Sequence, residues 1–285
     1  MALRAIQHPG PVASQRVDAL PVHVRQVDLV LQPGRSLLAA LVQALPPGCP
    51  SAVLRLHGGS LVPFAYVMPA LSKTPEHAVY FSDRFDAPGA VQLTDASITY
   101  GRRDGQPWLH CHARWEDDDG TAHCGHVLPD DAVLATPMAA SAWLMDGAGF
   151  EVVADAETRF TLFKPRPQPP ASDARPNALV VRVAPNEDIC SALEALCQAH
   201  GIQQASVRGG VGSTVGALFA DGRRVEPFVT EVLVQRGRIA PGADGQPQAK
   251  LDVSLVDHMG GLASGRLARG ANGVLVTFEL VLQPD

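Results

Sequence analysis

Three histidines stand at positions that two neighbouring β-strands would bring onto one face. His110 and His112 alternate with apolar residues in the run from Trp108 to Trp115, which is typical of a strand with one buried face. The residues Asp118-Asp119-Gly120 then suit a three-residue hairpin loop with glycine in the left-handed region. Counting back along both strands from this loop sets His126 directly opposite His112. We therefore predict that three imidazoles converge.

Converging imidazoles of this kind bind a divalent transition metal, either zinc or another ion, and leave one coordination position open. The alternative is a polar sheet face that merely carries histidines. Cys124 shares the face of His126 and is either a reserve ligand or a small buried cysteine. His123 points to the opposite face and is not part of the predicted site.

The histidine pattern resembles the motif of the PPC (plants and prokaryotes conserved) domain family. That motif has a His-x-His strand, an Asp-Gly turn and a Gly-Gly-His-Leu return strand, and this chain has His110-x-His112 and Gly125-His126-Val127-Leu128. Cys124 replaces the first glycine, and Val127 also departs from the motif. The stretch from Asp95 to Gly101 matches an acidic residue and a glycine that precede the histidine strand in the family. The resemblance takes in most of residues 22 to 163.

Membership of this family would imply an α+β fold with a largely antiparallel sheet, in which prokaryotic members bind metal through the three histidines. It also implies an oligomer, with a trimer favoured over a dimer. Plant members join the domain to an AT-hook that binds the DNA minor groove, so the family is associated with DNA binding as well.

The plan of the first half of the chain recurs in the second. Leu31 to Leu41 corresponds to Val183 to Leu193, because both are a strand end, a proline turn and a helix start. Helices are expected over about 36–45 and up to about His200, with Gly201 as the cap. The proline-rich residues between the halves form a semi-rigid linker by composition. We predict two tandem PPC-like domains, each a largely antiparallel sheet with one main helix: 1–163, the linker 164–176, and 177–285.

The second copy is expected to lack metal ligands. Where the first copy has His110-x-His112, the second has Asp252-Val253-Ser254, and Arg266 stands in the place of His126. Arginine does not ligate metal.

Two further kinds of side chain are candidates for the site. Asp95 is a candidate catalytic residue that would orient a metal-bound imidazole or act as a general base, although it could equally cap a turn. Arg102 and Arg266 are candidates for binding a substrate anion, since arginine presents a planar fork to carboxylates. For Arg102 the alternative is a solvated hairpin loop.

Composition narrows the function classes. The chain has 285 residues and a formal net charge of −6, which opposes a general affinity for phosphate backbones and predicts that DNA is an unlikely partner. No apolar run is long enough to span a membrane, and the first residues lack the apolar core of a signal peptide, so we expect a cytoplasmic protein without membrane contact. Five cysteines without a Cys-x-x-Cys pair argue against a disulfide framework.

Two functional hypotheses follow, with a metal-free oligomeric scaffold as a third. The first is a metal-dependent enzyme, a zinc-dependent hydrolase, lyase or isomerase, that acts on a small anionic substrate through the three-histidine site. The second is a PPC-type DNA-binding or transcription regulatory protein with a structural metal.

Overall fold

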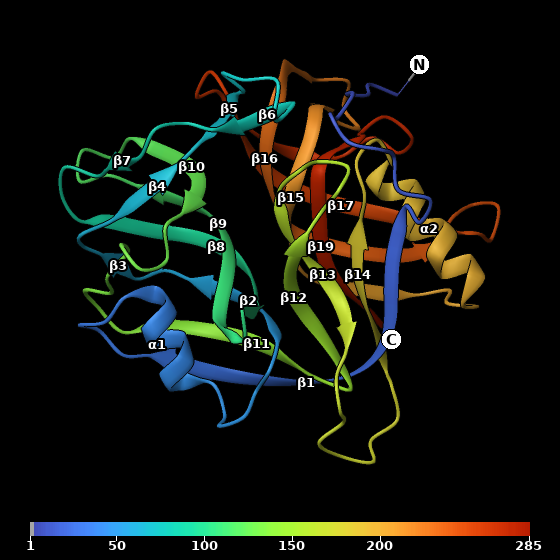
Figure 1. Ribbon diagram of the computed structural model, residues 1–285, viewed down its shortest axis with the longest axis horizontal. Helices are drawn as coiled ribbons and strands as arrows, with labels where there is room; N and C mark the ends of the chain where they lie inside the picture. The colour runs from blue at the N-terminus through green and yellow to red at the C-terminus, as the bar shows by residue number, and fades with distance from the viewer. Residues whose placement is uncertain (1–2) are drawn as a thin grey trace.

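The computed structural model describes residues 3–285 and consists mostly of antiparallel strands with two helices (Figure 1). The first half contains these main elements: β1 (Val17–Leu31), α1 (Leu37–Ala44), β2 (Ala52–His57), β8 (Val91–Arg103), β9 (Gln106–Glu116), β10 (Ala122–Val127) and β11 (Met138–Asp146). The second half contains β14 (Ala178–Val183), α2 (Ile189–Ala199), β15 (Ala205–Leu218), β16 (Arg224–Pro241), β17 (Pro247–Asp257), β18 (Leu262–Arg266) and β19 (Val274–Pro284).

The two halves pair their strands in the same order. In the first half, the hydrogen-bonded neighbours run β1-β11-β2-β8-β9-β10. In the second half, they run β14-β19-β15-β16-β17-β18. One helix follows the first strand of each half, as the sequence pattern predicts.

Both helices begin at a side-chain cap. The Ser36 hydroxyl accepts a hydrogen bond from the backbone N–H of Ala39 at the start of α1, and the Asp188 carboxylate accepts one from Ser191 at the start of α2. Helix α2 ends at Ala199, and Gly201 follows with a φ of +66°, the left-handed conformation that glycine adopts after a helix.

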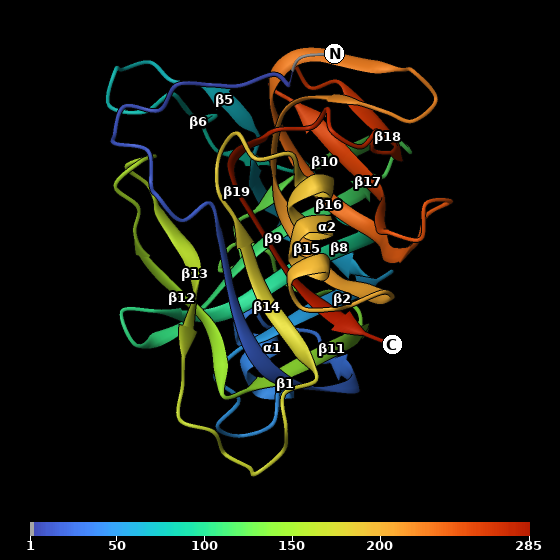
Figure 2. The same cartoon turned by 90° about the vertical axis from the view of Figure 1, so that its right-hand side faces the viewer.

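Each sheet packs one face against its own helix and turns the other toward the second sheet. In β9 the odd-numbered side chains, such as Leu109 and Trp115, are buried in the core with α1. Leu251 and Leu255 of β17 are buried in the core with α2. A third apolar cluster includes Val53 and Val281 and lies where the sheets meet. The helices therefore lie on the outer sides of the molecule (Figures 1 and 2).

Strand β1 belongs to both sheets. Its residues 23–31 pair with β11, whereas residues 17–22 pair with β14 of the second half. The segment before it also lies on the second half, where the Arg4 side chain donates to the Glu226 carbonyl and His8 hydrogen-bonds the Leu275 carbonyl. The predicted first domain of residues 1–163 thus begins with a segment that packs on the other half.

The predicted linker, residues 164–176, begins inside a strand. A hairpin of β12 (Ala148–Ala154) and β13 (Thr161–Pro167) follows β11, and its second strand contains Pro165 and Pro167. Strand β13 pairs with β12 alone, and an edge strand tolerates prolines because one row of its N–H groups has no partner strand. The irregular connection is therefore the shorter stretch from 168 to 177.

The first half also carries an insertion between β2 and β8. It contains five short strands: β3 (Ser60–Leu61), β4 (Ala65–Val67), β5 (Pro69–Leu71), β6 (Val79–Phe81) and β7 (Phe85–Asp86). Strands β5 and β6 form a two-stranded sheet of their own.

Within residues 3–285, no helix has the length and apolar character needed to cross a membrane.

Candidate metal centre

The hairpin β9–β10 has the predicted register. The Asp117 N–H donates to the Thr121 carbonyl over 3.0 Å, and Gly120 has a φ of +82°. Further along the strands, His112 lies directly opposite His126. His110 and His112 stand two residues apart on β9, so all three imidazoles lie on the face that meets the second sheet.

The three rings lie close enough to share one ion. Their ligand atoms are all within 4.8 Å of one another, and the ring centroids are 4.7–5.4 Å apart. The Nε2 atoms of His110 and His112 are separated by 3.1 Å. Two nitrogens bound to one tetrahedral zinc at about 2.0–2.1 Å would be roughly 3.3–3.4 Å apart, so this spacing fits a shared ion.

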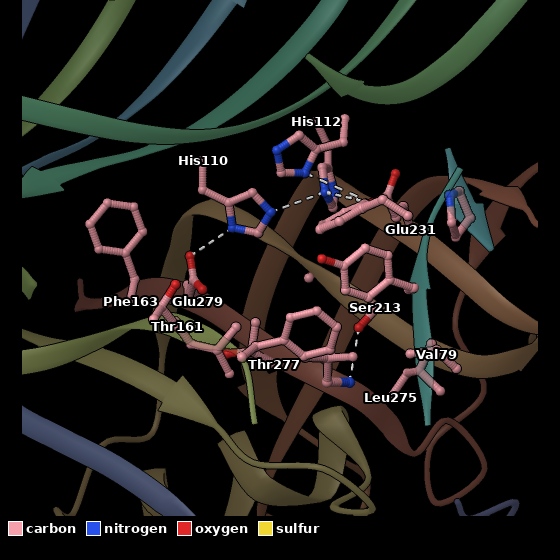
Figure 3. Close-up of a pocket in the computed structure, with 18 of the residues that line it drawn as sticks. Val79, His110, His112, Thr161, Phe163, Ser213, Glu231, Leu275, Thr277 and Glu279 are labelled. Atoms are coloured by element: carbon pink, nitrogen blue, oxygen red, sulfur yellow. Dashed lines mark hydrogen bonds and ion pairs between the residues drawn. The ribbon is translucent and has the colours of Figure 1, made fainter. Parts of the chain in front are cut away.

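Groups from the second half fix the orientation of two of these rings (Figure 3). The Nδ1 atom of His110 lies 3.0 Å from the Glu279 carboxylate, and the Nδ1 atom of His112 lies 2.9 Å from the Val232 carbonyl. A carbonyl only accepts, so the His112 proton is on Nδ1. Partners of this kind on the outer nitrogen are typical of metal-ligating histidines.

The unpaired atoms around the rings test whether a metal fits. In the neutral form of both rings, with Nδ1 of His110 and His112 donating outward, the two Nε2 lone pairs face each other, an arrangement that a shared cation stabilises. The Nδ1 atom of His126 and the Oε2 atom of Glu231 are buried, and neither has a hydrogen-bond partner among the described residues. The donor set therefore suits a divalent transition metal.

Burial sets the protonation of the site. Burial, together with the imidazoles of His110 and His126, holds the pKa of His112 well below its usual value. Burial and His110 also hold the pKa of His126 well below its usual value. Both rings are therefore neutral near pH 7, which is the form that binds metal.

Glu231 of β16 is a site residue that reasoning from the sequence missed. Its Oε1 atom lies 3.8 Å from both Nε2 of His112 and Nδ1 of His126, and burial raises its pKa well above the usual value. In the sequence, Glu231 precedes Gly237 by the same spacing as Asp95 precedes Gly101, so the sequence did contain a signal. In the sheets the two positions are not equivalent, because Asp95 pairs with Arg114 and Glu231 pairs with Val256. Glu279 of β19 had no comparable signal.

Asp95 lies away from the histidines. Its carboxylate forms an ion pair with Arg55 over 2.7 Å, and burial raises its pKa. It does not line the cavity that contains the three imidazoles.

The two predicted anion-binding arginines also lie outside this cavity. Arg102 donates to the Gly105 carbonyl in an exposed hairpin loop. Arg266 forms two hydrogen bonds with Asp252, at 2.8 and 3.0 Å.

Cys124 is fully buried, and burial raises the pKa of its thiol, which opposes the thiolate form that binds metal.

The second hairpin has the same turn as the first but different side chains. The Asp257 N–H donates to the Gly261 carbonyl over 3.0 Å, as Asp117 does to Thr121. Counted from this turn, Asp252 and Arg266 occupy the places of His112 and His126. Ser254 lies opposite Ser264, so its predicted equivalence to His112 is wrong by two residues.

The histidines form one end of a cavity of about 430 Å³ between the two sheets. Figure 3 shows His110, His112 and the neighbouring Glu231 at this end, with Ser213 and Thr277 across the cavity from them. The remaining wall is largely aromatic and includes Tyr80, Phe81, Trp108, Phe160 and Phe163.

Part of the chain matches a known family. Residues 171–284 match the family model of the Plants and Prokaryotes Conserved (PCC) domain, the family abbreviated PPC above. The predicted family is therefore confirmed for this stretch, which does not contain the three histidines. No curated protein matches the sequence.

Solved structures that align with part of the chain include a plant- and prokaryote-conserved protein of Pyrococcus horikoshii, with 13% identity and a TM-score of 0.39 over 53% of this chain and 97% of the other. A metal-containing protein of Archaeoglobus fulgidus has 16% identity and a TM-score of 0.39 over 50% and 95%. A "Putative DNA-binding protein" of Ralstonia eutropha has 15% identity and a TM-score of 0.35 over 48% and 88%.

The prediction that DNA is an unlikely partner is contradicted by these relatives. The Ralstonia protein and another from Bacteroides thetaiotaomicron carry DNA-binding names. Net charge describes only the average of the whole surface, and DNA binding depends on where the basic side chains lie.

Proposed function

Since residues 171–284 carry a Plants and Prokaryotes Conserved domain, we propose that the chain is a tandem pair of such domains, 1–163 and 177–285, and that only the first binds metal. The identical strand order, the equivalent helices and the matching hairpin turns support this proposal. Asp252 and Arg266, which neutralise each other, replace two of the histidines in the second copy.

We further propose that His110, His112 and His126 bind one divalent ion, zinc or another transition metal. The observation that carries this proposal is the pair of Nε2 atoms that face each other at 3.1 Å, each with its Nδ1 held from behind. The metal would supply a positive charge and an open coordination position. Elemental analysis of the purified protein tests it, and less than a tenth of an ion per chain would contradict it.

The function that we propose is that of a PPC-type DNA-binding or transcription regulatory protein in which the metal is structural. Glu279 and the Val232 carbonyl reach the histidines from the other domain, so metal binding would fasten the two domains together. The DNA-binding names of two relatives support the DNA partner. The test is binding of mixed-sequence duplexes by metal-loaded and metal-stripped protein at several salt concentrations. Absence of binding at low salt would contradict the proposal.

A metal-dependent hydrolase, lyase or isomerase is the second candidate, and Glu231 favours it. This buried carboxyl faces the cavity 3.8 Å from two histidines, and burial raises its pKa, which favours the protonated form that can donate a proton. Because Arg102 and Arg266 lie elsewhere, Arg103 is the arginine that lines this cavity. A Glu231→Gln variant that keeps its metal and its DNA affinity but loses turnover of a substrate would favour the enzyme.

Three expectations stay predictions beside these proposals. They are zinc as the particular metal, a trimer as the assembly, and a cytoplasmic location.

A further inference from the structure

The hairpin β5–β6 is an addition that distinguishes the first half from the second. Between β2 and β8 the first half has residues 58–90, whereas β15 passes to β16 through residues 219–223 alone. Strand β5 lies beside β16 of the other half (Figure 1). At the end of β6, the Phe81 ring packs edge-on against His126, with the centroids 5.0 Å apart. The added hairpin therefore closes the cavity next to the histidines.

This hairpin exposes aromatic rings toward the cavity. Tyr80 is 49% exposed and Phe81 is 39% exposed, and both line the cavity. Phe160 approaches them from the β12–β13 loop, stacked on Tyr80 at 5.7 Å and edge-on to Phe81 at 6.4 Å. Large rings that remain accessible beside a cavity gain free energy when a ligand covers them.

The facing wall, which comes from the second half, carries hydroxyl groups among apolar residues such as Val229 and Leu275. Ser213, Thr230 and Thr277 line it. The Ser213 hydroxyl oxygen accepts a hydrogen bond from the Val276 N–H over 3.0 Å, so its own proton is available to a ligand. The cavity thus offers an aromatic face, a hydroxyl-bearing face and a histidine end.

We propose that this cavity binds a small molecule with a flat aromatic or heteroaromatic ring and a nitrogen or oxygen donor that points at the histidines. The inference rests on the metal site proposed above, because the donor would occupy the open coordination position. A flat ring presents its faces to Phe81 and Phe160 while its edge reaches the hydroxyls. The volume of about 430 Å³ falls within the range of roughly 300–1,000 Å³ that small-molecule sites occupy.

Two matched probes test the flat ring. Isothermal titration of zinc-loaded protein compares 4-phenylimidazole with 4-cyclohexylimidazole, which has the same donor on a saturated ring. We expect the phenyl compound to bind about three- to tenfold more tightly, the worth of one or two aromatic contacts. Phe81→Leu should remove this preference and leave the zinc content unchanged.

Phe85→Leu is the matched control. Phe85 is also 39% exposed, but it stacks on Tyr66 at 5.3 Å and does not line the cavity. The preference for the phenyl compound should survive in this variant. Equal affinities for the two probes in protein with one bound zinc, or equal losses in both variants, would overturn the ring site. If the wild type takes up no zinc but still prefers the phenyl compound, the metal proposal fails and the ring site stands.

Discussion

Hairpins β9–β10 and β17–β18 have the same turn and the same place in their sheets, but one presents histidines where the other presents an ion pair. His112 and His126 face each other in the first, and Asp252 and Arg266 face each other in the second. The first pair is enclosed by groups from the other sheet, while the Arg266 side chain is 49% exposed. The same backbone therefore carries two different pairs of side chains. The packing of the other sheet encloses the histidine pair and leaves the ion pair exposed to solvent.

The largest difference between the hairpins should appear on truncation of His112. His112→Ala removes one of three ligands and leaves two nitrogens that cannot hold an ion well, so metal affinity should fall by at least about 100-fold. Elemental analysis after dialysis measures this loss. Asp252→Ala, the change at the corresponding place of the second hairpin, should leave the metal content unchanged. Equal metal content in the two variants would show that the ion is bound elsewhere.

The contribution of the second half to the site is tested at Glu279. Glu279→Gln keeps the shape of the side chain but removes the charge beside Nδ1 of His110, and affinity for the metal should fall about 10- to 100-fold. Competition with a chelator of known affinity measures the change. Glu194→Gln is the control, because Glu194 is also buried but pairs with Arg269 far from the histidines. A matching loss in the control would mean that general destabilisation, and not ring orientation, explains the effect.

The buried carboxyl of Glu231 should make the metal-free protein sensitive to pH. Burial raises its pKa in the folded state, so the folded protein keeps a proton that the unfolded chain, with a usual value of 4.5, releases. The resulting stability is fully present below pH 4.5 and is lost as pH rises through the folded pKa. Glu231→Gln has no carboxyl group to deprotonate, so its stability does not decrease in this way. The difference in melting temperature, variant minus wild type, should therefore increase between pH 4.5 and pH 8, by roughly 2–4 °C for each kcal/mol of stability that the wild type loses.

Glu226→Gln provides the control for this pH dependence. The Glu226 side chain is 74% exposed, so it stays largely hydrated in the folded protein and carries no burial cost. Its melting temperature relative to wild type should stay constant across the same range. A constant difference for Glu231→Gln as well would contradict the burial argument.

Local features of the site were predictable from the sequence, and those created by packing were not. The alternation around His110 and the glycine turn at Gly120 are short-range signals, and they set the register that brings His112 opposite His126. Glu279 contacts His110 across 169 residues of sequence, and only the packing of the two sheets creates that contact. For the same reason the acidic residue beside the histidines is Glu231 of the second half and not Asp95.

The fold shows the same division. The repeated helix starts were visible because Ser36 and Asp188 are local caps. The double pairing of β1 was not, because its residues follow one continuous strand pattern that does not reveal which sheet each end joins.

The smallest effect is expected at the ion pair of the second hairpin. Arg266 and Asp252 form two hydrogen bonds, but the pair is solvent-accessible, with side-chain exposures of 49% and 26%. Exposed pairs of this kind contribute about 0.2–1 kcal/mol, because water screens the charges and both side chains lose rotamer freedom. Chemical denaturation of Arg266→Ala, Asp252→Ala and the double variant would give the coupling free energy directly. A value above about 2 kcal/mol would exceed what an exposed pair supplies. It would then show that the second hairpin, like the first, is enclosed, for example by another copy of the chain.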